Sequence, residues 1–396
     1  MASVVINNRS EAATFNLDNT LMLTVLTLLA VGLVMMASAS ISISDERMGS
    51  PFHYLQRQSI LIFVGLVVAA LFFMVSLEHW ERFSPLLLVI GFILLILVLI
   101  PGIGHEVNGS RRWLPLGFTN FQASELVKLL VIIFLAGYLV RRIDEVRQTM
   151  GGFIKPLVIL ALLGALLMAE PDFGSTVVIL STALGMLFLA GVPLSRLIIL
   201  FSIVAGLLAV LVVVEPYRMA RMTSFMDPWA DPFGNGFQLT QALIAFGRGE
   251  WFGVGLGESI QKLFYLPEAH TDFIFSVLSE ELGFVGGAFV ILLFGLLVWR
   301  AFRIGNLALL NGQPFGGYLA FGIGIWVGVQ AFINIGVNMG VLPTKGLTLP
   351  LMSYGGSSIV VMCMAMALLQ RVYHEAKQAE LASYDKPANY NKGVAQ

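Results

Sequence analysis

The chain has 396 residues, of which 57% are apolar and only 12% are charged, and its mean hydropathy is +0.85. Soluble domains carry about 25% charged residues, so this composition excludes an ordinary water-soluble fold and indicates a protein embedded in lipid. The formal net charge of −1 offers no strongly basic surface, and no nucleic-acid partner is expected. A single cysteine, Cys363, excludes an intramolecular disulfide.

The first apolar run extends from Leu21 to about Ile43 and is long enough to cross a bilayer. It exceeds the roughly 7–15 residues of a signal-peptide core, so we expect it to be retained as a membrane span. Continuous runs of this length fit helices rather than the alternating strands of a membrane barrel. The sequence predicts an all-α integral membrane protein, a bundle of about ten transmembrane helices. The other nine runs lie at 59–76, 85–101, 123–140, 156–170, 174–192, 196–214, 273–299, 317–341 and 350–370.

Basic residues in the short connections set the expected orientation. With the N-terminus inside, most lysines and arginines of the short connections fall on the inner side, whereas the short outer loops hold Arg47, Arg57, Arg111, Arg112 and Lys345. Both termini are therefore expected to be cytoplasmic. The expected organisation is an N-terminal tail (1–20), a transmembrane domain (21–372) and a flexible cytoplasmic C-terminal tail (373–396).

The longest connection, 215–272, follows the seventh predicted helix and is expected to be extracytoplasmic. It contains several aromatic residues, including Trp229 and Trp251, and an amphipathic stretch from Phe237 to Phe246. Aromatic residues favour the headgroup level of a membrane, so this loop is expected to lie along the outer surface, partly as short interfacial helices. It is a candidate wall for a groove open to lipid.

Ionisable residues near the predicted helices are candidates for function because charges in a bilayer are costly. Glu125 and Lys128 share a helix face at i, i+3 spacing and either form a structural ion pair or serve a site. Glu280 and Glu281 lie two turns into the eighth helix, where they either brace the bundle or take part in catalysis.

Asp272 lies where the long loop meets the eighth predicted helix. Thr271 or Asp272 fits the N-cap of that helix, where a side-chain oxygen accepts a backbone hydrogen bond. A carboxylate at an interfacial cleft also fits a general base that removes a proton from a hydroxyl nucleophile. The residues alone leave both interpretations open.

A cluster rich in Gly, Pro and Ser spans 340–358, before the last predicted helix. The pair Gly355 and Gly356 lets backbone amides approach a ligand, and Lys345, Ser353 and Ser357 supply a cation and hydroxyls. This pattern fits a pyrophosphate site. Small residues are equally typical of tightly packed membrane helices, so the packing alternative stays open.

These stretches occur together, and in the same order, in the SEDS family (shape, elongation, division and sporulation proteins), which the chain resembles over about residues 20–372. The wording PTKG at 343–346 is similar to the cell-division branch of that family rather than the elongation branch. The segments that carry the resemblance are GSRRWL at 109–114, FQASELVK at 121–128, EAHTDFIF at 268–275, EELG at 280–283 and PTKG to SYGGSS at 343–358.

The resemblance implies a peptidoglycan glycosyltransferase that polymerises lipid II into glycan strands at the outer face of the bacterial cytoplasmic (inner) membrane. The 4-hydroxyl of one sugar attacks the anomeric carbon of another, and undecaprenyl pyrophosphate leaves. It implies that Asp272 is the catalytic carboxylate and acts as base toward the acceptor hydroxyl. The leaving diphosphate needs positive charge, from side chains or from a divalent cation such as Mg²⁺ or Mn²⁺. The candidate substrate-binding residues are Arg111, Arg112, Glu125, Lys128, Arg248, Lys345, Ser353 and Ser357.

The same resemblance implies a class B penicillin-binding protein as partner, a septal transpeptidase of the FtsI type, together with other divisome membrane proteins at the division septum. Two other functions fit the same features, a lipid II flippase and a non-catalytic divisome scaffold. A flippase would move the lipid without making polymer, whereas a scaffold would tolerate the loss of the Asp272 carboxylate.

Overall fold

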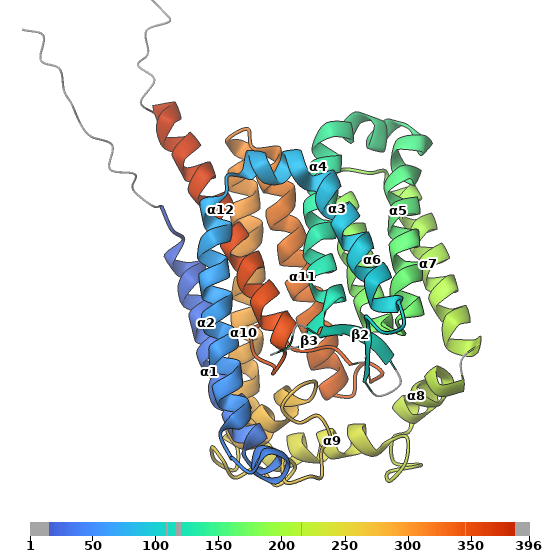
Figure 1. Ribbon diagram of the computed structural model, residues 1–396, viewed down its shortest axis with the longest axis vertical. Helices are drawn as coiled ribbons and strands as arrows, with labels where there is room; N and C mark the ends of the chain where they lie inside the picture. The colour runs from blue at the N-terminus through green and yellow to red at the C-terminus, as the bar shows by residue number, and fades with distance from the viewer. Residues whose placement is uncertain are drawn as a thin grey trace, which may run out of the picture.

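The computed structural model describes residues 16–107, 110–115, 117, 120–214, 216–344 and 346–384. These residues form long helices and three short strands, β1 (His105–Val107), β2 (Ser110–Pro115) and β3 (Asn120–Gln122) (Figure 1). The helices are α1 (Asn19–Met48), α2 (His53–Met74), α3 (Leu77–Leu99), α4 (Ala123–Gln148), α5 (Met150–Ala169), α6 (Phe173–Leu189), α7 (Leu194–Val214), α8 (Pro216–Met226), α9 (Phe237–Gly249), α10 (Ile274–Leu310), α11 (Pro314–Asn338) and α12 (Gly356–Tyr384).

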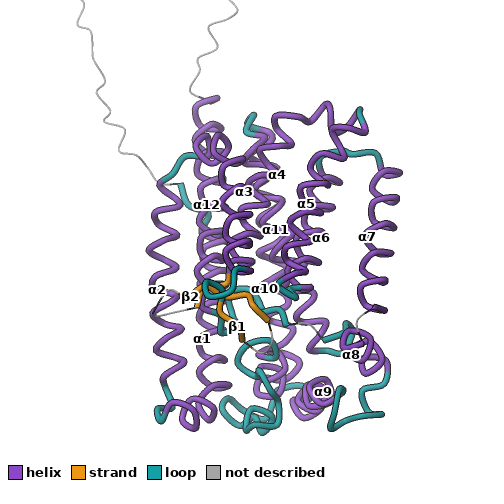
Figure 2. Tube along the Cα trace, turned by 45° about the vertical axis from the view of Figure 1, so that its right-hand side comes forward, coloured by secondary structure: helices purple, strands orange, loops and turns teal. Residues whose placement is uncertain are grey.

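The predicted helical membrane bundle is confirmed. Among the described residues, eight helices are long and apolar enough to cross a membrane, and the apolar helices Phe173–Leu189 and Leu194–Leu207 are shorter. Each predicted span overlaps a helix of the bundle. The start of α1 and the end of α12 lie at one end of the bundle, while the strands and the short helices α8 and α9 lie toward the other (Figures 1 and 2).

Burial divides the bundle into a centre and a periphery. The most hydrophobic windows of α4 and α11 are 83% and 72% buried, whereas that of α2 is only 17% buried. Helices α4 and α11 are therefore surrounded by protein, and polar side chains on them must find partners inside the bundle. Helix α2 instead presents most of its apolar surface outward, as expected of a helix that faces lipid.

The last helix begins and ends later than its predicted span. Residues 350–355 are irregular, and Pro350 precedes a left-handed Leu351. Beyond the predicted domain end at 372 the helix continues to Tyr384, because its polar residues have partners there: Glu375 accepts hydrogen bonds from Leu77 N (2.9 Å) and from Arg371 (2.6 Å). Residues 385–396 of the predicted tail lie outside the described residues.

The strands β1, β2 and β3 form an antiparallel sheet in chain order, which the all-α prediction missed. Trp113 pairs with Gln122, and Leu114 pairs with Phe121. Strand β3 leads directly into α4 at Ala123, so the sheet fixes where that central helix begins. It also carries Arg111 and Arg112.

Helix α10 is broken at Gly283, whose φ of 67° and ψ of −166° are not helical. Residues 250–255, just after α9, fill the break: Val254 N donates to Glu280 O (3.0 Å), and Phe284 N donates to Glu250 O (2.9 Å). The long predicted outer loop is thus joined to α10 by main-chain hydrogen bonds. The predicted amphipathic stretch at 237–246 is helical and forms most of α9.

Candidate functional site

Asp272 is half-buried and lies two residues before α10. The N-cap position is Phe273, not Thr271 or Asp272, and its side chain makes no capping bond. The cap comes from another helix instead, because Ser276 N and Ser276 Oγ both donate to Asn338 Oδ1, at 3.0 and 2.7 Å. The N-cap interpretation of Thr271 and Asp272 is therefore wrong.

The main chain of Asp272 is held by two buried amides of α11. Asn334 Nδ2 donates to Asp272 O at 2.8 Å, and Asn338 Nδ2 donates to the same oxygen at 2.9 Å. Asn334 Nδ2 also donates to Leu347 O at 2.6 Å. The two asparagines thus join the end of the long loop to the segment that follows α11.

A third buried amide, Gln330, lies one turn before Asn334 on α11. Its Nε2 donates to Thr348 O at 3.0 Å, and its Oε1 accepts from Lys128 Nζ and from Trp326 Nε1, each at 2.9 Å. Gln330, Asn334 and Asn338 are spaced i, i+4, i+8 and therefore share one helix face. We call these three residues the amide row. The sequence interpretation missed it, although three amides at this spacing in an apolar helix were a readable signal.

The segment after α11 lies against Asp272. A Cβ placed on Gly346 would be 3.4 Å from Asp272 Oδ2. Ser353 Oγ accepts from Leu349 N at 2.8 Å, and Tyr354 N donates to His270 O at 3.0 Å. Gly346 thus lies beside the carboxylate, and Tyr354, just after the turn at 349–353, is bonded to the long loop at His270. Lys345, the predicted cation of this segment, lies outside the described residues.

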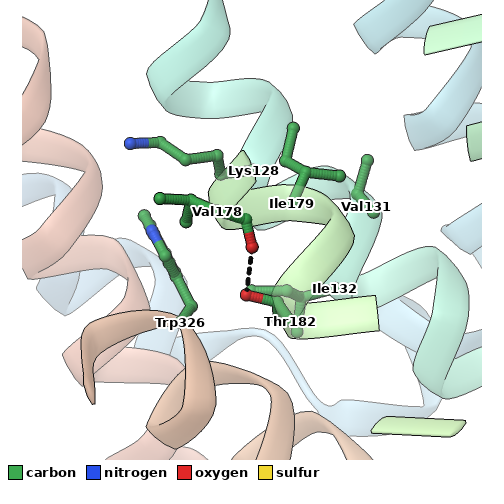
Figure 3. A pocket seen from close by; sticks show the side chains of 7 residues that line it. All are labelled: Lys128, Val131, Ile132, Val178, Ile179, Thr182 and Trp326. Carbon is green, nitrogen blue, oxygen red and sulfur yellow. Dashed lines mark hydrogen bonds between the residues drawn. The ribbon is translucent and has the colours of Figure 1, made fainter. Parts of the chain in front are cut away.

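The pair Glu125–Lys128 is buried, with side chains 6% and 1% exposed and a separation of 2.8 Å. Lys128 also lies over the ring of Trp326, 5.5 Å from its centroid. A small pocket beside it is lined otherwise by apolar side chains and Thr182, whose hydroxyl bonds its own helix (Figure 3). Because the lysine amine already has carboxylate and amide partners, this pocket is a packing site. Lys128 is linked to the segment after α11 through Gln330, which donates to Thr348 O.

Arg112 and Arg111 differ in what they contact. Arg112 Nε and Nη2 donate to the carbonyl oxygens of Glu170 (3.0 Å) and Pro171 (2.5 Å), so it ties β2 to the connection between α5 and α6. Arg111 pairs with Glu106 at 3.3 Å and remains 36% exposed. Arg111 therefore keeps an accessible side chain, whereas the Arg112 guanidinium group is engaged with two main-chain carbonyl oxygens.

A separate polar chain joins this connection to the start of α12. Asp172 accepts from Ser175 N and from Ser124 Oγ, at 3.1 and 2.8 Å. Gln122 Nε2 donates to Ser124 Oγ, and Gln122 N donates to Ser357 Oγ at 2.7 Å. The hydroxyl of Ser357 thus anchors β3 in this conformation.

Two ionisable side chains in the connections between helices have shifted pKa values. Burial, followed by the negative charge of Asp172, raises the pKa of Glu170 to about 8, and neither of its carboxyl oxygens has a partner among the described residues. Burial lowers the pKa of His270 below its ordinary value, so its ring, in tilted contact with Tyr54 and Tyr354, is a neutral packing group near pH 7 rather than a cation for phosphate.

Glu280 and Glu281 are fully buried and act as braces. Glu280 accepts from Arg248 (2.8 Å), from Ser259 Oγ and from two loop amides. Glu281 accepts from Lys262 (2.8 Å) and from Ser38 (2.7 Å). Arg248, predicted to bind substrate, is thus engaged in holding the loop onto α10. Among the described residues, no three His, Cys, Asp or Glu side chains gather as a metal site.

The chain matches the FtsW/RodA/SpoVE family of cell cycle proteins over residues 19–378. Among its relatives, the probable peptidoglycan glycosyltransferase FtsW of Thioalkalivibrio sulfidiphilus is 56% identical over 363 residues, which is 92% of this chain and 91% of the relative. The protein of the same name from Hahella chejuensis is 48% identical over the full length of both chains.

Two solved structures resemble the fold. One is a chain of a peptidoglycan synthase complex that coordinates polymerization and crosslinking, with a TM-score of 0.74, 32% identity, and coverage of 91% of this chain and 99% of that chain. The other is the rod shape determining protein RodA of Thermus thermophilus, with a TM-score of 0.68, 29% identity, and coverage of 91% and 98%. Because the family match spans most of the chain and the relatives are aligned along nearly their whole length, this protein belongs to the FtsW/RodA/SpoVE family of cell cycle proteins.

Proposed function

We propose that this protein is a peptidoglycan glycosyltransferase that polymerises lipid II into glycan strands at the division septum. Its FtsW-named relatives, at 48–57% identity, carry that enzyme name. The observation that carries the proposal is the carboxyl group of Asp272, half-buried, excluded from helix capping, and placed beside Gly346 by the amide row.

In the proposed reaction, Asp272 accepts the proton of the acceptor 4-hydroxyl as that oxygen attacks the anomeric carbon of the donor sugar. The bond from the anomeric carbon to the diphosphate breaks, and undecaprenyl pyrophosphate leaves with the bonding electrons. Positioned proton transfer of this kind contributes roughly 100- to 10,000-fold to a rate. The amide row fixes the main chain of Asp272, which favours a defined position for its carboxylate.

The developing negative charge on the diphosphate needs cations at the same outer surface. Arg111 is exposed enough to contact a lipid headgroup, and Lys345 directly precedes Gly346 in the chain. Lys128 is 1% exposed, so its proposed contribution is indirect, through Gln330. A single carboxylate offers too few ligands for Mg²⁺ or Mn²⁺, so diphosphate oxygens of the substrate would have to supply the others. Mg²⁺ is commonly bound in this way, by one or two carboxylates together with substrate phosphates.

The basic residues in the short connections predicted to be inside support a cytoplasmic location for the end of the bundle where α1 starts and α12 ends. Asp272 then faces the outer side of the membrane. The proposed partner is a class B penicillin-binding protein, because one structural neighbour belongs to a complex that both polymerizes and crosslinks.

The test is polymer formation from labelled lipid II by the purified protein with its transpeptidase partner. Glycan strands that require this chain support the enzyme. Movement of lipid II across vesicle membranes without polymer would instead identify a flippase. Partner binding with neither activity would identify a scaffold.

A further inference from the structure

The amide row contacts the main chain on both sides of the proposed site. From α11, Asn334 and Asn338 donate to Asp272 O, Asn334 also donates to Leu347 O, and Gln330 donates to Thr348 O. The three side chains are at most 2% exposed. Water therefore cannot easily replace these bonds, and the geometry they impose depends on the amides themselves.

The two asparagines of the row make different contacts. Asn338 uses its oxygen to cap α10 through Ser276 and its nitrogen to hold Asp272 O. Asn334 uses its nitrogen on two carbonyl oxygens, those of Asp272 and Leu347. Hydrogen bonds from one helix, α11, thus hold both the start of α10 and the segment beside Gly346 in position.

We propose that Asn334 and Asn338 are positioning residues that fix the Asp272 carboxylate relative to the 346–348 segment, an inference that rests on the proposed function. Neither amide needs to touch the substrate for this role. A reacting group held through its main chain keeps its orientation when the substrate arrives, and a displacement of about 1 Å can cost about 100-fold in rate.

Asn338→Asp separates the two uses of Asn338. The carboxylate retains an acceptor for Ser276 and suits a helix N-terminus, but it lacks the amide donor for Asp272 O. Ser276→Ala is the converse change, because it removes a hydroxyl from the cap and leaves the Asn338 amide in place. Asn338→Leu and Asn334→Leu, of similar volume, remove the donors without adding charge.

The measurement is steady-state polymerisation of lipid II by the purified complex of each variant with its transpeptidase, with thermal unfolding and complex formation as folding checks. We expect Asn338→Asp and both leucine variants to lower kcat about 10- to 100-fold with KM for lipid II nearly unchanged. Ser276→Ala and the control Thr182→Val, which removes a buried hydroxyl within α6, should stay within about two-fold of wild type.

Unchanged kcat in folded Asn334 and Asn338 variants would overturn the positioning role. An equal loss of turnover in Ser276→Ala would also overturn it. The cap of α10, rather than the hydrogen bonds from the asparagines to Asp272 O, would then control the rate. Failure of the proposed function itself looks different: the wild-type complex would then form no glycan polymer. Failure of the Asp272 role alone would leave Asp272→Asn polymerising normally, whatever the asparagine variants do.

Discussion

Gly283 faces Gly253 across the break in α10, so closely that a Cβ on Gly283 would lie 2.4 Å from the amide nitrogen of Gly253. The reciprocal Cβ on Gly253 would lie 2.1 Å from Glu281 O. The outer loop can therefore reach the main chain of α10 only because both residues lack a side chain. The buried Glu280 and Glu281 reinforce this contact with hydrogen bonds to the loop.

Gly283→Ala is expected to destabilise the protein by several kcal/mol, because its backbone conformation is essentially restricted to glycine and the added methyl group overlaps the loop. Gly295→Ala is the matched control, since it lies in the same helix with no atom within 4 Å of the added Cβ. Thermal unfolding in detergent measures both. Equal melting temperatures for the two variants would show that the close approach is not required.

Glu170 predicts a pH dependence of stability. Its pKa is raised from 4.5 to about 8 in the fold, so the folded state holds its proton more tightly than the unfolded chain does. This contribution is fully present below pH 4.5 and is lost as the pH rises through about 8. Glu170→Gln should match wild type at acidic pH and exceed its melting temperature by roughly a few °C at pH 9.

Melting curves of wild type and Glu170→Gln at pH 4 and pH 9 provide the comparison. Glu258→Gln, which changes an exposed carboxyl group between α9 and α10, is the control for the substitution itself. A difference between Glu170→Gln and wild type that is the same at both pH values would contradict the buried, protonated carboxyl.

The orientation proposed for the bundle predicts which ends react with reagents outside the cell. Asn235→Cys lies exposed in the connection before α9 and should react with an impermeant thiol reagent, whereas Ser383→Cys, exposed near the end of α12, should react only after permeabilisation. The native Cys363 is 3% exposed and gives little background. Labelling of residue 383 but not residue 235 in intact cells would show that the bundle has the opposite orientation.

Long apolar runs made most of the bundle predictable, since only a helix satisfies its own backbone in lipid. The sheet was not predictable from periodicity. Strands β1 and β3 have only three residues each, and two adjacent arginines, Arg111 and Arg112, break the alternation of apolar and polar residues in β2. The extension of α12 depends on distant partners such as Leu77, which a local pattern does not contain.

The site was predictable in part. Asp272 stood out as a carboxyl at a loop–helix junction, and the structure leaves it half-buried beside Gly346. The partners of Arg112 and Arg248 were not predictable, because they are the carbonyl oxygens of Glu170 and Pro171 and the buried Glu280. Both contacts join segments far apart in the sequence.

Lys345→Ala is expected to raise KM for lipid II more than it lowers stability, because the proposal places this cation near the diphosphate. Lys155→Ala is the control, an exposed lysine near the opposite end of the bundle. Initial rates at limiting and saturating lipid II separate KM from kcat. Normal polymerisation at limiting lipid II by folded Lys345→Ala would remove this lysine from the site.

The most direct measurement compares Asp272→Asn with Glu258→Gln in complex with the transpeptidase, after thermal stability and complex formation have been matched to wild type. The amide nearly preserves the size of the carboxyl group but cannot take the proton of the acceptor hydroxyl. The account predicts that Asp272→Asn loses roughly 100- to 10,000-fold in turnover of labelled lipid II into glycan polymer, while Glu258→Gln remains near wild type. Near-normal turnover by a folded, partner-bound Asp272→Asn would contradict it.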